Sequence, residues 1–403
     1  MRVDRRIVLG ALVLFTVAFP LLVLAASPQP LLPGLPRYRC DPLAGDAYGY
    51  YYSVRQIISV LRRDAPLILA AAFLAAVLIV VAWRRSTHVA VRLVAVAWGC
   101  GIVAAAVADR VQPSGAGQFG WPLVWSLPMV PIAAVGGPLG PDVAYGVGLA
   151  LGLACNAAVV VAAYRIARSA GLGERLALAG AALVAFWPLL LLLAGHKSSW
   201  NGTWQNWLGL AVVTEPLSTA LVVVALALVV DRRFGEGRAA LAGALLGLGT
   251  LVRLTNVVAI ACVLAWLLAA RRLREAALLA AAALAWLPAV IAYWPKGYPS
   301  LPPRVFSRHP FALHYATTSW AHNFLWHPAT LLALVPVALV GSARADRRVS
   351  ALLWSCVAAT ALVYTFYYGT WQHPRFLFVV LPIVLVYWAA GAAVLLQKLS
   401  SAR

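Results

Sequence analysis

The sequence predicts an all-α integral membrane protein, a polytopic bundle of about twelve transmembrane helices joined mostly by short loops. Three observations lead to this. Of the 403 residues, 63% are apolar and only 11% are charged, less than half the charged share of an ordinary soluble domain. The mean hydropathy is +0.86. Apolar runs also recur along the whole chain. We therefore expect a single transmembrane domain over residues 1–403 and exclude disordered and collagen-like chains.

The first apolar run follows a basic start at residues 1–6 and continues for about twenty residues, the length of a spanning helix. It is too long for the apolar core of a secretory signal, so we interpret it as a retained first helix with its basic end in the cytoplasm. Further runs of this kind predict the remaining spans. They cover residues 67–83, 90–108, 142–164, 176–193, 208–230, 238–252, 254–270, 275–294, 329–341, 349–368 and 375–396.

Arginine-rich turns support this count, because they fall on every second loop, as positively charged cytoplasmic loops should. They are Arg84, Arg85 and Arg92; Arg165, Arg168 and Arg175; Arg232, Arg233 and Arg238; Arg271, Arg272 and Arg274; and Arg344, Arg347 and Arg348. Both termini are then cytoplasmic, and the long loops, including 27–66 and 295–328, lie outside. The net charge of +20 follows from this topology, and no basic and aromatic surface indicates nucleic acid as a partner.

Two segments depart from a plain bundle. The stretch 238–270 is interrupted by Arg253 and Asn256, which predicts two short helices that meet at the outer surface. The stretch 121–136 begins with three prolines in eleven residues, which favours a broken juxtamembrane helix rather than a span, since proline removes a backbone donor.

Ionisable residues at helix ends on the predicted outer side are the candidate functional groups, because such groups are costly in a membrane. The candidates are Asp46, Asp109, Lys197, Glu215, Arg253, His373 and Arg375. Their convergence on one side is the strongest functional signal in the sequence, since solvated loop charges have no reason to gather at the ends of several helices.

Asp46 precedes a predicted interfacial helix in the loop 27–66. Val54, Ile57, Ile58 and Leu61 recur at spacings of three and four, which gives this helix one apolar face. The carboxylate of Asp46 suits a general base that takes the proton of a hydroxyl nucleophile. The structural alternative is that Asp46 only caps the helix.

Glu215 and Arg253 also have structural alternatives. Glu215 stands before Pro216 at the start of a span, where a carboxylate caps the helix or interacts with its dipole. Arg253 lies at a depth where a lone cation is costly, so it requires an anion. That anion is either Glu215 in an ion pair or the phosphate of a ligand, which an arginine fork binds well. For Arg375 the alternative is a snorkelling side chain.

Metal sites and disulfides are not indicated. The histidines of the loop 295–328 are spaced by five and eight residues, so no two share a helix face as zinc ligands do. Four of the five cysteines lie in apolar runs, and only Cys40 lies in a long loop, which excludes an external disulfide framework.

Several segments together resemble the GT-C superfamily of lipid-dependent membrane glycosyltransferases, and the likeness covers most of the chain. The first loop carries Gly-Asp46-Ala-Tyr-Gly-Tyr-Tyr, and a Pro/aromatic stretch at 119–122 leads into a Leu/Ala helix that ends in arginine. Three further motifs follow: Thr-Glu215-Pro-Leu-Ser, Gly-Leu-Gly-Thr-Leu-Val-Arg253-Leu-Thr and His373-Pro-Arg375-Phe-Leu.

The resemblance implies transfer of a sugar, such as mannose, another hexose or a pentose, from a polyprenyl-phosphate donor with inversion on the extracytoplasmic side of a bacterial plasma membrane. Asp46 would be the base. Arg253 and Arg375, with His373 and Lys197, would hold the phosphate leaving group, and Glu215 would bind sugar hydroxyls or orient an arginine.

This sequence departs from the family pattern in two ways. A single Gly-Asp replaces adjacent acidic residues, and two additional helices follow Asp46, so Asp109 remains an alternative base. No paired carboxylates lie near Asp46, so a divalent metal is not indicated, although the chemistry would allow one. No other cofactor is expected. The acceptor is a lipid, a glycan or a protein.

Two other classes of function stay open. A secondary transporter or lipid flippase can also have twelve spans and a broken helix. However, we find no matching break in the other half of the sequence and no acidic or polar residue near the middle of the membrane to couple an ion. A non-catalytic scaffold would share the topology without requiring Asp46.

Overall fold

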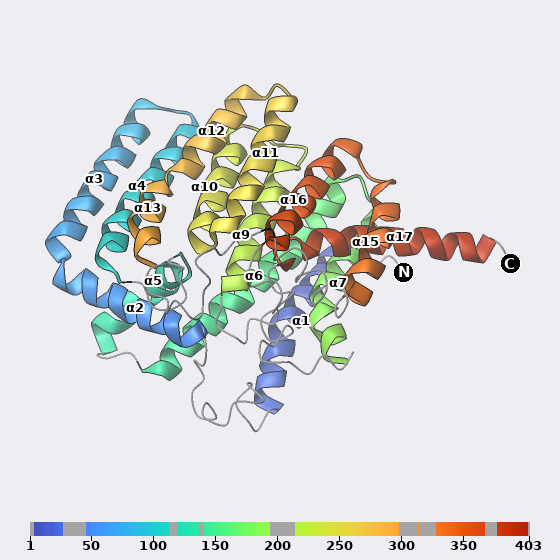
Figure 1. Ribbon diagram of the computed structural model, residues 1–403, viewed down its shortest axis with the longest axis horizontal. Helices are drawn as coiled ribbons and strands as arrows, with labels where there is room; N and C mark the ends of the chain where they lie inside the picture. The colour runs from blue at the N-terminus through green and yellow to red at the C-terminus, as the bar shows by residue number, and fades with distance from the viewer. Residues whose placement is uncertain are drawn as a thin grey trace.

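The computed structural model describes residues 4–26, 46–112, 120–136, 140–193, 214–297, 313, 328–366 and 377–401. Within these residues every regular element is a helix (Figure 1). The helices are α1 (Arg5–Ala26), α2 (Asp46–Arg63), α3 (Ala65–Arg85), α4 (Val89–Arg110), α5 (Gly120–Gly136), α6 (Pro141–Ser169), α7 (Glu174–Leu193), α9 (Thr214–Val229), α10 (Glu236–Val252), the 3₁₀-helix η2 (Leu254–Asn256), α11 (Val257–Ala269), α12 (Leu273–Leu284), α13 (Leu287–Gly297), α15 (Pro328–Ser342), α16 (Arg347–Thr365) and α17 (Leu381–Ser401).

Seven helical segments of the described chain are long and apolar enough to cross a membrane. They are Arg5–Leu22, Ala65–Arg85, Val89–Arg110, Asp142–Ser169, Leu273–Tyr293, Arg347–Thr365 and Leu381–Ser401. The outer surface of α3 exposes Leu69 and Phe73 by 68% and 72%, which suits a helix whose solvent is lipid. These helices indicate a membrane protein, while the count of about twelve spans stays a prediction.

The predicted break in the stretch 121–136 is wrong, because α5 is one continuous helix with Pro128 and Pro131 inside it. Trp121, Trp125 and Met129 recur every four residues along α5 and are completely buried. This stripe packs α5 against α2 and α6, and its burial offsets the hydrogen bonds that the prolines remove.

The predicted span 275–294 corresponds to the candidate span Leu273–Tyr293. Within it a short turn separates α12, which ends at Leu284, from α13, which begins at Leu287. Pro288 has no N–H to donate to the carbonyl of Leu284, which ends the regular hydrogen bonding of α12. By contrast, the predicted break near Arg253 is confirmed, since α10 ends at Val252 and α11 begins at Val257.

The arginine-rich turns gather at one end of the bundle, which we call the basic end. Three hydrogen bonds tie these turns to one another: Arg272 Nη2 to Phe234 O (2.9 Å), Trp266 Nε1 to Arg348 O (3.1 Å) and Asp346 N to Ala170 O (2.8 Å). In Figure 1 the turns between α3 and α4 and between α11 and α12 both lie at the upper edge. The alternating arginine pattern of the sequence therefore corresponds to a real grouping in space.

Helices α9, α10 and α16 each have one terminus at the basic end and carry Glu215, Arg253 and Tyr364 at the other. The 17 residues of α10 place Arg253 about 25 Å from that end. Helix α2 lies across the lower end of α3 in Figure 1. Its apolar residues include Val54 and Ile57, which are buried, as predicted for one face of an amphipathic helix.

Glycines allow several helices to pack with backbones in close contact. Gly243 and Gly247 of α10 face the backbone of α12 at Leu279 and Ala283, and Gly341 of α15 faces α17 at Gly391. A β-carbon at any of these glycines would overlap the neighbouring helix. The position of α10, and with it that of Arg253, is therefore fixed by close contact with α12.

Candidate functional site

Arg253 occupies the break between α10 and η2, where the backbone is extended (φ −147°, ψ 117°). The side chain of Asn256 stabilises this break. Its Nδ2 donates to the carbonyl of Gly249 at 2.8 Å and to the hydroxyl of Ser218 at 2.8 Å. The carbonyl of Gly249 also accepts from the N–H of Arg253, so the first bond adds a second donor at the end of α10, and the second bond ties the break to α9. The Arg253 side chain thereby leaves the helix in a fixed direction.

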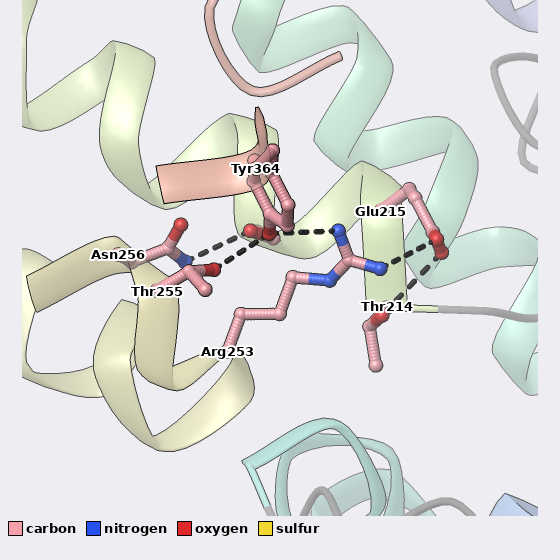
Figure 2. Close-up of polar contacts among 7 residues, drawn as sticks. Thr214, Glu215, Arg253, Thr255, Asn256 and Tyr364 are labelled. Carbon is pink, nitrogen blue, oxygen red and sulfur yellow. Dashed lines mark hydrogen bonds and ion pairs between the residues drawn. The ribbon is translucent and has the colours of Figure 1, made fainter. Parts of the chain in front are cut away.

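Arg253 forms a buried ion pair with Glu215 (Figure 2). Its Nη2 donates to Glu215 Oε1 at 2.8 Å, and the two side chains are exposed by only 7% and 3%. Thr214 Oγ1 lies 3.4 Å from Glu215 Oε2. Removing both charges from water costs several kcal/mol per ion, so each charge requires the other. Of the two partners that the sequence allowed for Arg253, the structure shows the carboxylate.

Tyr364 approaches the same guanidinium from α16. Its hydroxyl lies 3.5 Å from Arg253 Nη1 and 2.6 Å from Thr255 Oγ1 (Figure 2). Two elements therefore reach Arg253, α9 through Glu215 and α16 through Tyr364, and Thr255 of η2 holds the hydroxyl of Tyr364. A guanidinium held on two sides is preorganised for binding an anion.

An aromatic and aliphatic cluster connects this site to α2. Tyr50 and Tyr51 of α2, Trp121 of α5, Leu217 of α9 and Val252 of α10 are buried in one continuous cluster. Leu217 follows Glu215 by two residues, and Val252 directly precedes Arg253. The N-terminal half of α2, which begins at Asp46, is thus packed into the same end of the bundle as the ion pair.

A small pocket, lined in part by Glu215, lies between α1, α6, α7 and α9. Among the described residues that line it, Thr16, Asn156, Glu215 and Thr219 are polar and the others are apolar. Asn156 is near the middle of α6, so the expectation that no polar residue lies deep within a span is wrong. The residues around Asn156 are apolar on all sides of the helix, so no periodic pattern marked Asn156 as part of a site.

The remaining predicted site residues differ in what the structure says of them. Asp46 is the first residue of α2. This position agrees with both interpretations of Asp46, the helix cap and the general base. Asp109 is exposed on α4, with Arg110 at 3.6 Å. Lys197, His373 and Arg375 lie outside the described residues, so their proximity to Arg253 stays a prediction.

Four residues of the site were not among the candidates: Ser218, Thr255, Asn256 and Tyr364. They are uncharged, and the search for costly buried groups concentrated on ionisable ones. The sequence did contain one signal, since Asn256 was recognised as an interruption of the apolar run. A second polar residue beside an arginine in an apolar run therefore indicates how the helix break is built.

Metal ligands do not gather in the described part of the chain, where no group of three or more His, Cys, Asp or Glu side chains could hold an ion. The histidines of the loop 295–328 lie outside it. In comparisons with known proteins, no family model, curated protein or solved structure matches this chain. The resemblance to the GT-C superfamily accordingly rests on the sequence motifs.

Proposed function

We propose that this protein is an integral membrane glycosyltransferase that moves a sugar, such as mannose, another hexose or a pentose, from a polyprenyl-phosphate donor to an acceptor hydroxyl. The observation that carries the proposal is the buried ion pair of Arg253 and Glu215. It lies at the end of the bundle opposite the arginine-rich turns, beside the helix that begins at Asp46. On this proposal the basic end and both termini are cytoplasmic, and the site faces the outside of a bacterial plasma membrane.

The reaction requires a base and a site for the leaving group. Asp46 takes the proton from the acceptor hydroxyl, whose oxygen then bonds to the anomeric carbon. The bond from that carbon to the phosphate oxygen breaks, and the electron pair leaves with the polyprenyl phosphate. Attack from the opposite face inverts the anomeric centre.

Arg253 supplies the positive charge for the leaving phosphate, whose charge grows in the transition state. Arginine has five N–H donors, so a guanidinium that binds Glu215 through Nη2 can still donate to a phosphate. Glu215 and Tyr364 orient it. Arg375, His373 and Lys197 are proposed to complete the phosphate site.

The test is sugar transfer in proteoliposomes that contain a panel of polyprenyl-phosphate sugars, with wild-type protein and Asp46→Asn at equal folded amounts. We expect the wild type to consume one donor and the variant to consume none. Equal consumption by both would keep the enzyme class and move the base to Asp109. No consumption by either would refute the glycosyltransferase proposal.

A secondary transporter or lipid flippase is the alternative, and the polar pocket at Asn156 is the observation in its favour. Against it, the carboxylate of Glu215 is already neutralised by Arg253, which leaves it no net charge for coupling an ion. Flux of a fluorescent polyprenyl phosphate across the same proteoliposomes, without sugar transfer, would establish the alternative.

A further inference from the structure

The turn between α3 and α4, residues 83–92, differs in charge from the other arginine-rich turns. It carries Arg84, Arg85 and Arg92, and it contains no aspartate or glutamate. Four of the carboxylates in the other turns pair with an arginine, and the fifth caps α16. These five residues, at least one in or directly beside each of the other four turns, are Glu174, Asp231, Glu236, Glu275 and Asp346. The α3–α4 turn therefore has a positive charge that none of its own residues neutralises.

Carboxylates from elsewhere in the chain do not neutralise this turn either. Eleven of the twelve acidic residues lie in the described part of the chain, and within that part the side chains of Arg84 and Arg85 make no hydrogen bond or ion pair. Glu236, at the start of the neighbouring helix α10, pairs with Arg274 at 3.9 Å. The twelfth, Asp41, belongs to the segment before α2, and α2 lies at the opposite end of α3 (Figure 1). The counter-charge of the turn therefore comes from the surroundings of the protein.

Arg92 gives this turn a cation in a fixed position. Its Nε donates to the carbonyl of Ser86 at 3.0 Å and its Nη2 to the carbonyl of Trp83 at 3.3 Å. Its guanidinium also lies over the ring of Trp83, with Cζ 4.8 Å from the ring centroid. Arginine has five N–H donors, so these bonds leave others for an anion. The two exposed arginines that end α3 thus stand beside a third that is held in place.

The outer face of α3 leads from exposed apolar residues to this turn. Within the described part of the chain, α3 packs mainly against α4. Its outer face has exposed apolar residues at spacings of four, four and three, namely Leu69, Phe73, Val77 and Val80. The next position on this face, four residues later, is Arg84, and Trp83 beside it is half exposed, as is typical of the membrane interface. One helix face thus offers an apolar stripe for acyl chains and a cation at its end for a headgroup.

We propose that the α3–α4 turn binds the headgroup of an anionic phospholipid whose acyl chains lie along α3. An arginine fork binds phosphate oxygens well, and clusters of arginine beside a spanning helix attract anionic lipids. A zwitterionic headgroup fits less well, because its own ammonium group already balances its phosphate. This binding does not depend on the proposed sugar transfer, since it requires only the basic turn and the lipid-facing helix.

The experiment uses the full-length protein in phosphatidylcholine nanodiscs that contain a small amount of phosphatidylglycerol with a photoreactive diazirine in one acyl chain. Phosphatidylcholine with the same labelled chain is the comparison probe. We expect saturable labelling of peptides from α3 or α4 by phosphatidylglycerol, about fivefold or more above that by phosphatidylcholine. Unlabelled phosphatidylglycerol should compete, whereas soluble glycerol 3-phosphate, which lacks the acyl chains, should not.

A pair of double variants tests the turn directly. Arg84→Gln with Arg85→Gln should lower the labelling about tenfold or more. Arg232→Gln with Arg233→Gln is the matched control, because it removes the same charge from a turn that contains Asp231, and it should label as the wild type does. Arg84→Lys with Arg85→Lys keeps the charge and should keep most of the labelling. All four arginines are exposed, so we expect each variant to fold.

Four outcomes would overturn the inference. Equal labelling by the two lipids would make α3 an ordinary lipid-facing helix. An equal loss in both glutamine variants would indicate the general charge of the basic end rather than a site in this turn. Competition by glycerol 3-phosphate would indicate a site for a soluble anion. Labelling that does not saturate would show that no site exists.

Discussion

The guanidinium of Arg253 and the carboxylate of Glu215 meet at 2.8 Å although 38 residues separate them in the chain. The two residues come together because α9 and α10 form a hairpin, with Glu215 in the first turn of α9 and Arg253 directly after α10. Both side chains are buried. The pair therefore fixes the mutual position of these two helix ends as well as the direction of the arginine.

Removing one member of this pair should destabilise the protein strongly. Glu215→Gln leaves the Arg253 cation buried without a counter-charge, and we expect a loss of about 3 kcal/mol in the free energy of unfolding. Thermal unfolding in detergent measures it. The double variant Glu215→Gln, Arg253→Met removes both charges and should recover much of the stability, but not the transfer activity. A single variant as stable as the wild type would contradict the buried pair.

Asp46→Asn separates the two roles of that residue, because asparagine starts helices as well as aspartate does but cannot act as a base. We expect α2 to form as before, with unchanged circular dichroism, and the transfer rate to fall by a factor of about 10² to 10⁴. Asp109→Asn, on the exposed end of α4, is the matched control and should retain its rate. An active Asp46→Asn protein together with an inactive Asp109→Asn protein would reverse the assignment.

The hydroxyl groups of Tyr364 and Thr255 lie 2.6 Å apart. We expect their contributions to the stability of the protein to depend on each other. Tyr364→Phe and Thr255→Val each break the same bond, so we expect each to cost about 1 kcal/mol of stability and the double variant to cost little more than either. A double-mutant cycle measures the coupling. Fully additive effects would show that the two side chains do not interact.

Gly243 on α10 should not tolerate a β-carbon. A β-carbon there would overlap the backbone of Leu279 on α12, so we expect Gly243→Ala to cost about 1 to 3 kcal/mol. Gly146 on α6 has open space around it, and Gly146→Ala should be neutral or stabilising through its helix propensity. Comparable melting temperatures for the two alanine variants would rule out close α10–α12 packing.

Asp231, in the turn between α9 and α10, should make stability depend on pH. Burial acts to raise the pKa of Asp231, but the backbone N–H of Arg233, the hydrogen bond and charge of Arg238 and the charge of Arg165 outweigh burial and lower the pKa below 3.8. The ionised form is thus favoured by folding. The stabilisation is present above the ordinary aspartate pKa of about 4 and is lost as the pH falls through the lowered value.

The measurement is the difference in melting temperature between the wild type and Asp231→Asn as a function of pH. The wild type should be the more stable protein near neutral pH, and the difference should disappear in acid. A difference that stays unchanged as the pH falls through the whole acid range would exclude an ionic origin.

The helical framework followed from the sequence because apolar runs and arginine-rich turns are strong, local signals. The break at Arg253 was predicted correctly for a physical reason, since a cation within an apolar run requires an interruption and a partner. The turn before Pro288 was not predicted, because a single proline in an apolar run also allows a continuous kinked helix. Helix α5 shows the opposite case, since it continues through Pro128 and Pro131. A proline alone therefore does not tell whether a helix breaks.

The site was harder to predict than the helices. Glu215 and Arg253 were recognised by their charge, and their pairing was one of two stated alternatives. Tyr364 follows Arg253 by 111 residues in the chain. Only the packing of α16 brings its hydroxyl to the guanidinium. The pocket at Asn156 likewise depends on four helices at once, a relationship that no local pattern contains.

The order of Glu215 and Arg253 along the chain has a consequence for biosynthesis. The ribosome makes α9 before α10, so the carboxylate is already present when the arginine emerges. A cation that enters a bilayer alone is costly, whereas one that follows its counter-ion as the second arm of a hairpin is neutralised on arrival. On the prediction that residues 208–230 and 238–252 both span the bilayer, the same contact that orients the arginine lowers the barrier to its membrane insertion.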